Sequence, residues 1–158
     1  MLNFIIRPRS AQQKRRIGFD TRFIAVVWFM LASVAHAGDL VVIVNPASEI
    51  TQLSQDDLTR IFLIKTKTYP NEKPVVPFIP REDDPTRLQF EAAVLEKSPM
   101  QVKAYWTRLL FTGRGNPPPA LESDQEILEK VRKDPAAIGY VKASNADKSV
   151  KTVFILKD

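Results

Sequence analysis

Apolar positions divide the chain after residue 38 into short strands and amphipathic helices. The segment Asp39–Asn45 is apolar almost throughout and ends in Asn-Pro, which is typical of a strand buried on both faces of a sheet. A later segment has apolar residues at i, i+3, i+4, i+7 and i+8: Val102, Tyr105, Trp106, Leu109 and Leu110. This spacing predicts an amphipathic helix, and we expect Trp106 to lie in the core rather than at a ligand site.

A serine precedes each of three predicted helices, where its hydroxyl can accept a hydrogen bond from a free backbone N–H group. These serines are Ser54, Ser98 and Ser123. Residues 137–141 and 150–156 are rich in strand-forming side chains. The order of elements is strand, helix, strand, three helices and two strands. It predicts an α/β domain with three layers (α/β/α) and a mixed or mainly parallel sheet of about four to five strands.

The stretch Val75–Phe90 combines a strand, a sharp turn and a helix start. Its first residues are β-branched or aromatic, as in a strand. Asp84 followed by Pro85 is a favourable helix entry, because a carboxylate caps free N–H groups and proline needs no N–H donor at the first helical position. We therefore expect a strand that leads through a tight turn into a helix N-terminus.

This turn has the chemistry of an oxyanion site. Arg81 and Arg87 flank it, and it contains the Thr86 hydroxyl. Forked guanidinium groups, free N–H groups and the positive end of the helix dipole all favour an anion. The alternative is an ordinary capped helix whose arginines are solvated or paired with Glu82 and Asp83.

A second arginine-containing segment offers a weaker signal. Arg114 lies between Gly113 and Gly115, after the predicted helix that contains Trp106. Such a glycine pair can expose backbone N–H groups to an anion. The same sequence also fits the simple exit of a helix, and both interpretations stay open.

Residues 1–37 have the layout of a secretory signal peptide. A basic front precedes an apolar run, Phe23–Val34, and the small-x-small sequence Ala35-His36-Ala37. The run is shorter than the roughly 20 residues that span a bilayer. We expect cleavage after Ala37, which leaves one domain of residues 38–158 in the periplasm. The alternative is an uncleaved N-terminal anchor. We expect the protein to contact a membrane only in that second case.

Composition excludes several functional classes. The first 37 residues carry six basic residues and one acidic residue, so residues 38–158 carry 17 of each and are formally neutral. The high isoelectric point therefore gives no support to nucleic-acid binding. The chain has no cysteine, and its only histidine, His36, lies in the leader. Ser–His and Cys–His catalysis are thus excluded, and we expect a non-enzymatic protein without metal or cofactor.

Several motifs occur in a characteristic order: Leu53-x4-Leu58-x2-Ile61-Phe62, a lysine-rich connection, Val76-x4-Arg81 with Thr86 and Phe90 beyond, Trp106, and Ala137-Ile138-Gly139-Tyr140-Val141. Together they resemble the phosphate-binding proteins of ABC importers, which have the type 2 periplasmic binding-protein fold. The resemblance covers nearly all of Gly38–Leu156. Full members of that family have two lobes that close over the ligand, and about 120 residues supply a single lobe.

The resemblance implies a phosphate site in the same turn. Arg81 matches the family's arginine, Asp83 occupies the place of its aspartate, Thr86 matches its threonine, and Arg87 follows directly. An aspartate suits monoprotonated phosphate, because it can accept the remaining phosphate proton. Asp84-Pro85 departs from the family's Ser-Gly, which removes a hydroxyl and a backbone N–H from the site.

We therefore expect an exported domain that binds inorganic phosphate or a similar oxyanion. The expected ligand groups are Arg81, Asp83, Thr86, Arg87 and Arg114. The alternative is a single-lobe interaction module that has lost ligand binding and uses its open face for an envelope protein or for self-association. An enzyme is the third hypothesis, because the domain offers no convincing pair of catalytic carboxylates.

Overall fold

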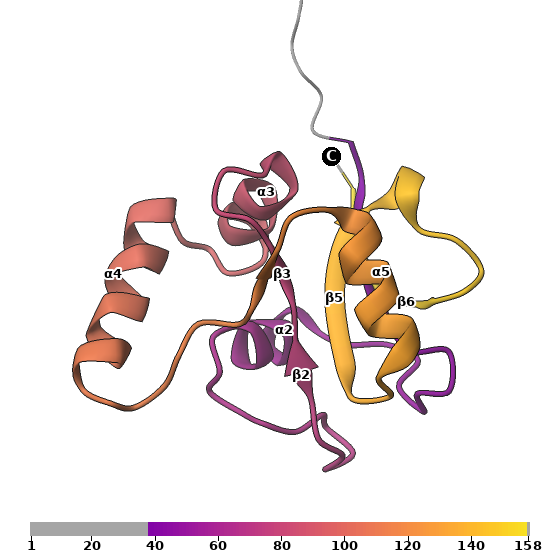
Figure 1. Cartoon of the computed structure of the whole chain (residues 1–158), viewed down its shortest axis with the longest axis horizontal. Coiled ribbons are helices and arrows are strands. Elements are labelled where there is room, and N and C mark those ends of the chain that lie inside the picture. Colours follow the sequence, from indigo (N-terminus) through magenta and orange to yellow (C-terminus); the bar gives the residue numbers. More distant parts are fainter. Residues whose placement is uncertain (1–37, 158) are drawn as a thin grey trace, which may run out of the picture. The chain divides into compact units, whose positions relative to one another are not determined.

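The computed structural model describes residues 38–157, which are built around a four-stranded sheet in the order β2-β5-β1-β6 (Figure 1). β1 (Leu40–Val44) is antiparallel to β5 (Ala137–Lys142) and to β6 (Lys151–Leu156). β2 (Val76–Pro77) is parallel to β5. The sheet is therefore mixed, as predicted, and only the β2–β5 pair of this sheet is parallel.

Both faces of β1 are buried, as its apolar run predicts. Leu40, Val42 and Val44 belong to one hydrophobic cluster, whereas Val41 and Ile43 belong to another. Side chains alternate between the two faces of a strand, so the two clusters lie on opposite sides of the sheet. The predicted three-layer arrangement follows directly from this alternation.

Helices cover both faces of the sheet. α2 (Gln55–Phe62), α3 (Pro85–Ala93) and α4 (Pro99–Phe111) contribute buried side chains to the first cluster. α5 (Asp124–Lys133) packs alone against the second cluster. A 3₁₀ turn, η1 (Ala143–Asn145), leads from β5 towards β6.

The predicted caps form at the helix starts. The hydroxyls of Ser54, Ser98 and Ser123 each accept a hydrogen bond from the backbone N–H three residues later. In α4, Val102 and Trp106 are buried, and Trp106 is a core residue as expected. Leu110 was expected on the same buried face but is 50% exposed, because it lies at the edge of that face and borders a groove.

The strand expected after Val75 is two short strands in two different sheets. β2 pairs with β5, whereas β3 (Ile79–Pro80) pairs in parallel with β4 (Ala120–Leu121). The backbone N–H of Phe78 donates to Ile138 O, and the next N–H, that of Ile79, donates to Pro119 O. Successive N–H groups of an extended chain point in opposite directions, so this segment bridges β5 and β4.

The described residues form a self-contained folding unit. Both hydrophobic clusters and all strand pairs lie within residues 40–156, and residues 38–157 belong to one compact unit. Within residues 38–157, every helix is too short or too polar to cross a bilayer.

Candidate functional site

The β3–α3 turn has the conformation that its sequence predicts. Pro80 ends β3, and Pro85 is the first residue of α3. The Asp84 carboxylate caps the helix by accepting a hydrogen bond from Thr86 N at 2.8 Å. The backbone N–H of Arg81 donates to Leu121 O at 3.0 Å, which attaches the turn to β4.

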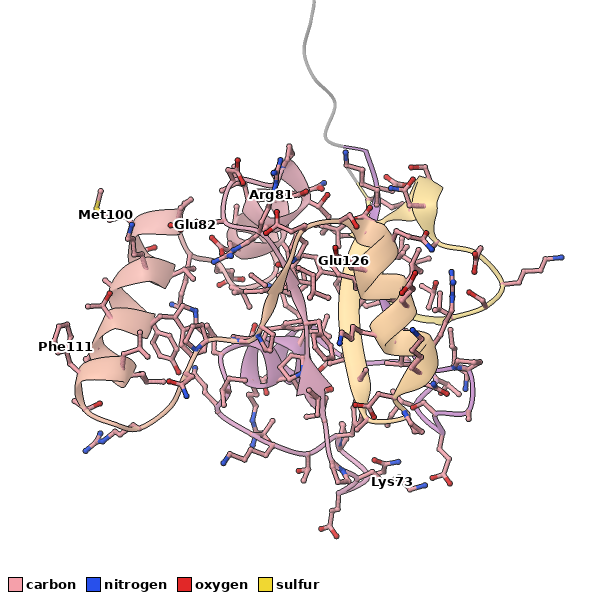
Figure 2. The ribbon with its side chains drawn as sticks, in the orientation of Figure 1. Lys73, Arg81, Glu82, Met100, Phe111 and Glu126 are labelled. Carbon is pink, nitrogen blue, oxygen red and sulfur yellow. The ribbon has the colours of Figure 1, made fainter. Side chains whose placement is uncertain are left out.

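A groove of about 350 Å³ lies between this turn and α4. Its apolar lining consists of Ile79, Pro99, Trp106, Leu110, Pro117, Pro118 and Ala120. Its polar lining consists of Arg81, Glu82, Arg87, Glu91, Lys103 and Thr107. Figure 2 shows Arg81 and Glu82 on the segment that leads into α3, with Glu82 on the side that faces the start of α4. We refer to this feature as the α3–α4 groove.

Arg87 and Glu91 form a buried ion pair on one wall of the α3–α4 groove. Arg87 Nε lies 2.7 Å from Glu91 Oε1, and the two side chains are only 13% and 6% exposed. Arg87 Nη1 also donates to Pro80 O at 3.2 Å, which fixes the guanidinium against the end of β3. Because Glu91 compensates its charge, Arg87 attracts an added anion less than an isolated arginine would.

Arg81 is the more accessible of the two arginines. Its side chain is 53% exposed, and its Nε lies 3.3 Å from Asp83 Oδ1. Ion pairs in water contribute little, so an anion can compete with Asp83 for this guanidinium. Lys103 and Glu82 form a looser contact of 3.7 Å across the groove, and both are 75% exposed.

Thr86 lies beneath the surface and does not line the groove. It is 2% exposed, and its Oγ1 is the one buried side-chain polar atom of residues 38–157 without a hydrogen-bond partner. A buried hydroxyl without a partner costs stability. An anion in the groove would reach this oxygen only after a local rearrangement of the helix start.

The five sequence-predicted site residues do not converge on one point. Arg81 and Arg87 line the same groove. Asp83 faces solvent beside Arg81, Thr86 is buried, and Arg114 is exposed on the loop after α4 and outside the groove lining. The alternative interpretation of the turn, arginines paired with neighbouring acids, describes the Arg81–Asp83 contact well.

Other residues of the groove were not anticipated from sequence. Glu91, Lys103 and the prolines of residues 117–118 line it. Trp106 lines it too, although it was expected in the core and not at a ligand site. The i, i+4 spacing of Arg87 and Glu91 is a recognisable signal for an ion pair on a helix. The approach of α4 and of residues 117–120 to β3 has no comparable local signal.

Two aromatic rings, those of Phe90 and Tyr140, line a small cavity beside the Arg87–Glu91 pair. The ring of Tyr140 stacks on Phe90 with centroids 3.9 Å apart. Burial raises the pKa of the Tyr140 phenol well above its ordinary value, so this side chain stays neutral at physiological pH. Among residues 38–157, no group of three or more acidic, cysteine or histidine side chains is placed to hold a metal ion.

The structure resembles part of several solved proteins, and two of the three named below are described as phosphate transport or phosphate-binding proteins. Each comparison covers 72% of this chain. An ABC-type phosphate transport receptor from Vibrio cholerae has 18% identity and a TM-score of 0.57, with 44% of its chain covered. PstS from Borrelia burgdorferi has 14% identity and a TM-score of 0.56, with 46% covered. A Clostridium perfringens protein, described as an ABC transporter substrate-binding protein and solved with bound phosphate, has 19% identity and a TM-score of 0.56, with 43% covered. The chain thus spans less than half the length of these structures.

Of the two sequence comparisons, one identifies a family. No curated protein matches this chain. A model described as the PBP superfamily domain matches residues 10–157, nearly the whole sequence. The fold, a mixed α/β layer structure that resembles part of a periplasmic binding protein, is the one expected from the motifs quoted above. The chain therefore belongs to the PBP superfamily.

Proposed function

We propose that this domain binds phosphate or a similar oxyanion in the α3–α4 groove and that it is a binding protein rather than an enzyme. The observation that carries the proposal is the position of Arg81 and Arg87 in one groove beside the start of α3. Arg81 supplies the accessible charge, and Arg87 supplies a guanidinium held in place by Glu91 and Pro80 O. The phosphate bound by the Clostridium perfringens relative supports this ligand class.

The charge balance of the groove favours weak binding. Glu91 compensates Arg87, and Asp83 lies beside Arg81. The groove is also open to solvent, where charge-assisted contacts are weakened by the high dielectric constant. We expect an affinity near 1 mM, about half the free energy of a micromolar site.

Calorimetric titration of residues 38–158 with inorganic phosphate tests the proposal. Arg81→Ala should weaken phosphate binding by about 1.5–3 kcal/mol, the contribution of one charge-assisted contact. Lys130→Ala is the matched control, because it removes one exposed positive charge from α5 on the other face of the sheet. The proposed site is contradicted if the unaltered domain gives no heat of phosphate binding. It is also contradicted if the Arg81→Ala variant binds phosphate as strongly as the unaltered domain.

The proposed location is the periplasm, with residues 1–37 acting as a cleaved leader. The support comes from the basic front, the short apolar run and the Ala35-His36-Ala37 sequence. Intact-mass measurement of protein from cell-envelope fractions should give a chain that begins at Gly38. If the membrane pellet instead contains protein with the mass of the full chain, residues 1–37 are an uncleaved anchor.

A protein-interaction module is the second candidate function. The observation in its favour is the apolar floor of the groove, formed by Ile79, Trp106 and the segment that contains Pro117 and Pro118. Sedimentation at two protein concentrations, in parallel with the phosphate titration, separates the two functions. If phosphate binds only to the self-associated or partner-bound domain, both functions apply, because association would exclude water from the groove.

A further inference from the structure

Positive charge is concentrated in one segment of the domain. Residues 97–121, which contain α4, carry Lys97, Lys103, Arg108 and Arg114 and no acidic residue. Residues 38–158 are neutral as a whole, so the rest of the domain carries a net charge of −4. Such a separation of charge orients a protein in an external electric field. The segment that contains α4 is therefore basic within a domain that is neutral overall.

The outward face of α4 carries a stripe of apolar and small side chains. Met100, Ala104, Thr107 and Phe111 follow one another at i, i+4, i+7 and i+11, the spacing of one helix face. All four are exposed, and Met100 and Phe111 are 81% and 88% exposed. Figure 2 shows these two side chains at the two ends of α4, both on its outer side. We call these four residues the α4 stripe.

The α4 stripe lies opposite the face that anchors the helix. Val102 and Trp106 are buried in the core, so α4 is held without any contribution from Met100 or Phe111. Side chains this exposed bury little apolar area and contribute little to the stability of the domain. They are 11 residues apart, which corresponds to about 16 Å along the helix axis.

Basic side chains flank the α4 stripe on both sides. At 100° per residue, Lys103 lies on one side of the stripe and Arg108 on the other. Arg114 follows Phe111 after a turn in which Gly113 has a φ of 63°. Within residues 38–157, neither Arg108 nor Arg114 has an ion-pair partner, and Lys103 has only the loose contact with Glu82. Their charge is therefore available to a partner.

We propose that the α4 stripe docks on an anionic lipid surface, with α4 parallel to the membrane plane. Apolar side chains that project from a helix with basic flanks match the depth profile of a bilayer interface, where acyl chains lie below a layer of phosphate groups. Phe111 and Met100 would enter the upper acyl region, while Lys103 and Arg108 would contact lipid phosphates.

A lipid surface fits this geometry better than a protein pocket. The α4 stripe is convex, and its two large apolar side chains lie at opposite ends with Ala104 and Thr107 between them. A deformable surface accepts two separate anchors without a preformed cavity. The net charge of −4 on the rest of the domain would be repelled by the same surface, which leaves α4 as the contact side.

Vesicle co-sedimentation with residues 38–158 tests the proposal. The leader is omitted because its apolar run would itself bind lipid, and circular dichroism verifies that the unit is folded. The domain should sediment with vesicles that contain phosphatidylglycerol and remain in solution with pure phosphatidylcholine. Raising the salt concentration from about 0.05 M to about 0.5 M should release it, since screening removes the electrostatic part of the attraction.

Two variants separate the apolar and the basic contributions. Met100→Ser/Phe111→Ser should lower the partition coefficient at least about tenfold, and Arg108→Glu about tenfold. The matched controls are Ile155→Ser, which removes a 55% exposed side chain from β6, and Lys130→Glu, which reverses an exposed charge on α5. Both controls should stay within about twofold of the unaltered domain, because they lie outside the contact side.

Other outcomes would overturn the proposal. Equal binding to neutral vesicles, no binding to anionic vesicles, or equal losses in the two controls would each rule out docking through the α4 stripe. A stable dimer that dissociates when Met100 and Phe111 are replaced would assign the stripe to a second copy of the chain. The stripe variants change only exposed side chains, so unchanged thermal unfolding distinguishes lost docking from lost folding.

Discussion

The two faces of the central sheet are covered in different ways. On one face, α5 packs closely: Ile127, Leu128 and Val131 are 0–2% exposed against β1 and β5. On the other face, α2, α3 and α4 enclose a larger cluster, and the same side contains the α3–α4 groove. Figure 1 shows α5 in front of β5 and shows α4 at the opposite side of the unit.

Three unusual features of the domain belong to the α3–α4 side. They are the buried Arg87–Glu91 pair, the unpartnered Thr86 hydroxyl and the exposed side chains of α4. The unpartnered hydroxyl and the exposed apolar side chains cost stability or solubility without a compensating contact in the domain. The ion pair buries two charges that compensate each other. The α5 side has apolar packing, ion pairs at the surface and one buried polar side chain, Asn45, whose amide donates to Val131 O and Arg132 O. The difference supports the proposal that ligands bind on the α3–α4 side, while α5 stabilises the fold.

The largest expected effect on the α3–α4 side comes from Glu91→Ala. It leaves the Arg87 guanidinium buried without its carboxylate, and we expect the free energy of unfolding to fall by about 3 kcal/mol. Urea unfolding measures the change. Glu129→Ala is the control on α5, where an exposed i, i+4 pair with Lys133 should contribute less than about 0.5 kcal/mol. Similar losses in both variants would remove the distinction between the two sides.

Close packing on the α5 side predicts that Gly139→Ala lowers the free energy of unfolding, but by less than Glu91→Ala. A Cβ at this position would lie 2.5 Å from Ile127 Cγ2, so β5 and α5 must separate slightly. We expect a loss of about 1–3 kcal/mol in thermal or urea unfolding. Gly115→Ala is the control, because its Cβ would meet Leu109 Cδ2 at an ordinary 3.6 Å. If Ile127→Leu, which removes the Cγ2 methyl group, restores the free energy of unfolding of Gly139→Ala, the clash is the cause.

Thr86→Val, on the α3–α4 side, should stabilise the domain. It replaces an unpartnered buried hydroxyl by a methyl group, so the free energy of unfolding should rise by about 1 kcal/mol. Thr59→Val should lower it by about 1 kcal/mol, because the Thr59 hydroxyl donates to Val94 O at 3.1 Å. If Thr86→Val instead leaves stability unchanged and abolishes phosphate binding, the hydroxyl is a ligand group after all.

The smallest effect concerns acid stability near α5. Hydrogen bonds from the Ser149 hydroxyl and N–H, followed by the charge of Arg132, hold the pKa of Asp147 below its ordinary value of 3.8. A lowered pKa in the folded state contributes stability that is complete above pH 3.8 and is lost as the pH falls through the folded-state value. Melting temperatures of Asp147→Asn should therefore fall less steeply below about pH 4.

Local sequence determined the helix starts and the central strand. The caps at Ser54, Ser98 and Ser123 depend on a hydroxyl and an N–H three residues away, so they can be recognised in any context. The burial of β1 on both faces follows from an apolar run without polar alternation. The same local logic predicted the turn at Asp84-Pro85 and placed Arg81 and Arg87 beside a helix start.

The tertiary structure decided what surrounds those arginines. Parallel pairing of β3 with β4 joins residues about 40 positions apart and brings Pro117, Pro118 and Ala120 to the groove. The packing of α4 against this region adds Trp106 and Lys103. Charge compensation and burial depend on such distant neighbours, which no pattern within a few residues encodes. Sequence therefore identified the candidate cations, and only the fold distinguished the paired, buried Arg87 from the exposed Arg81 and separated both from Thr86 and Arg114.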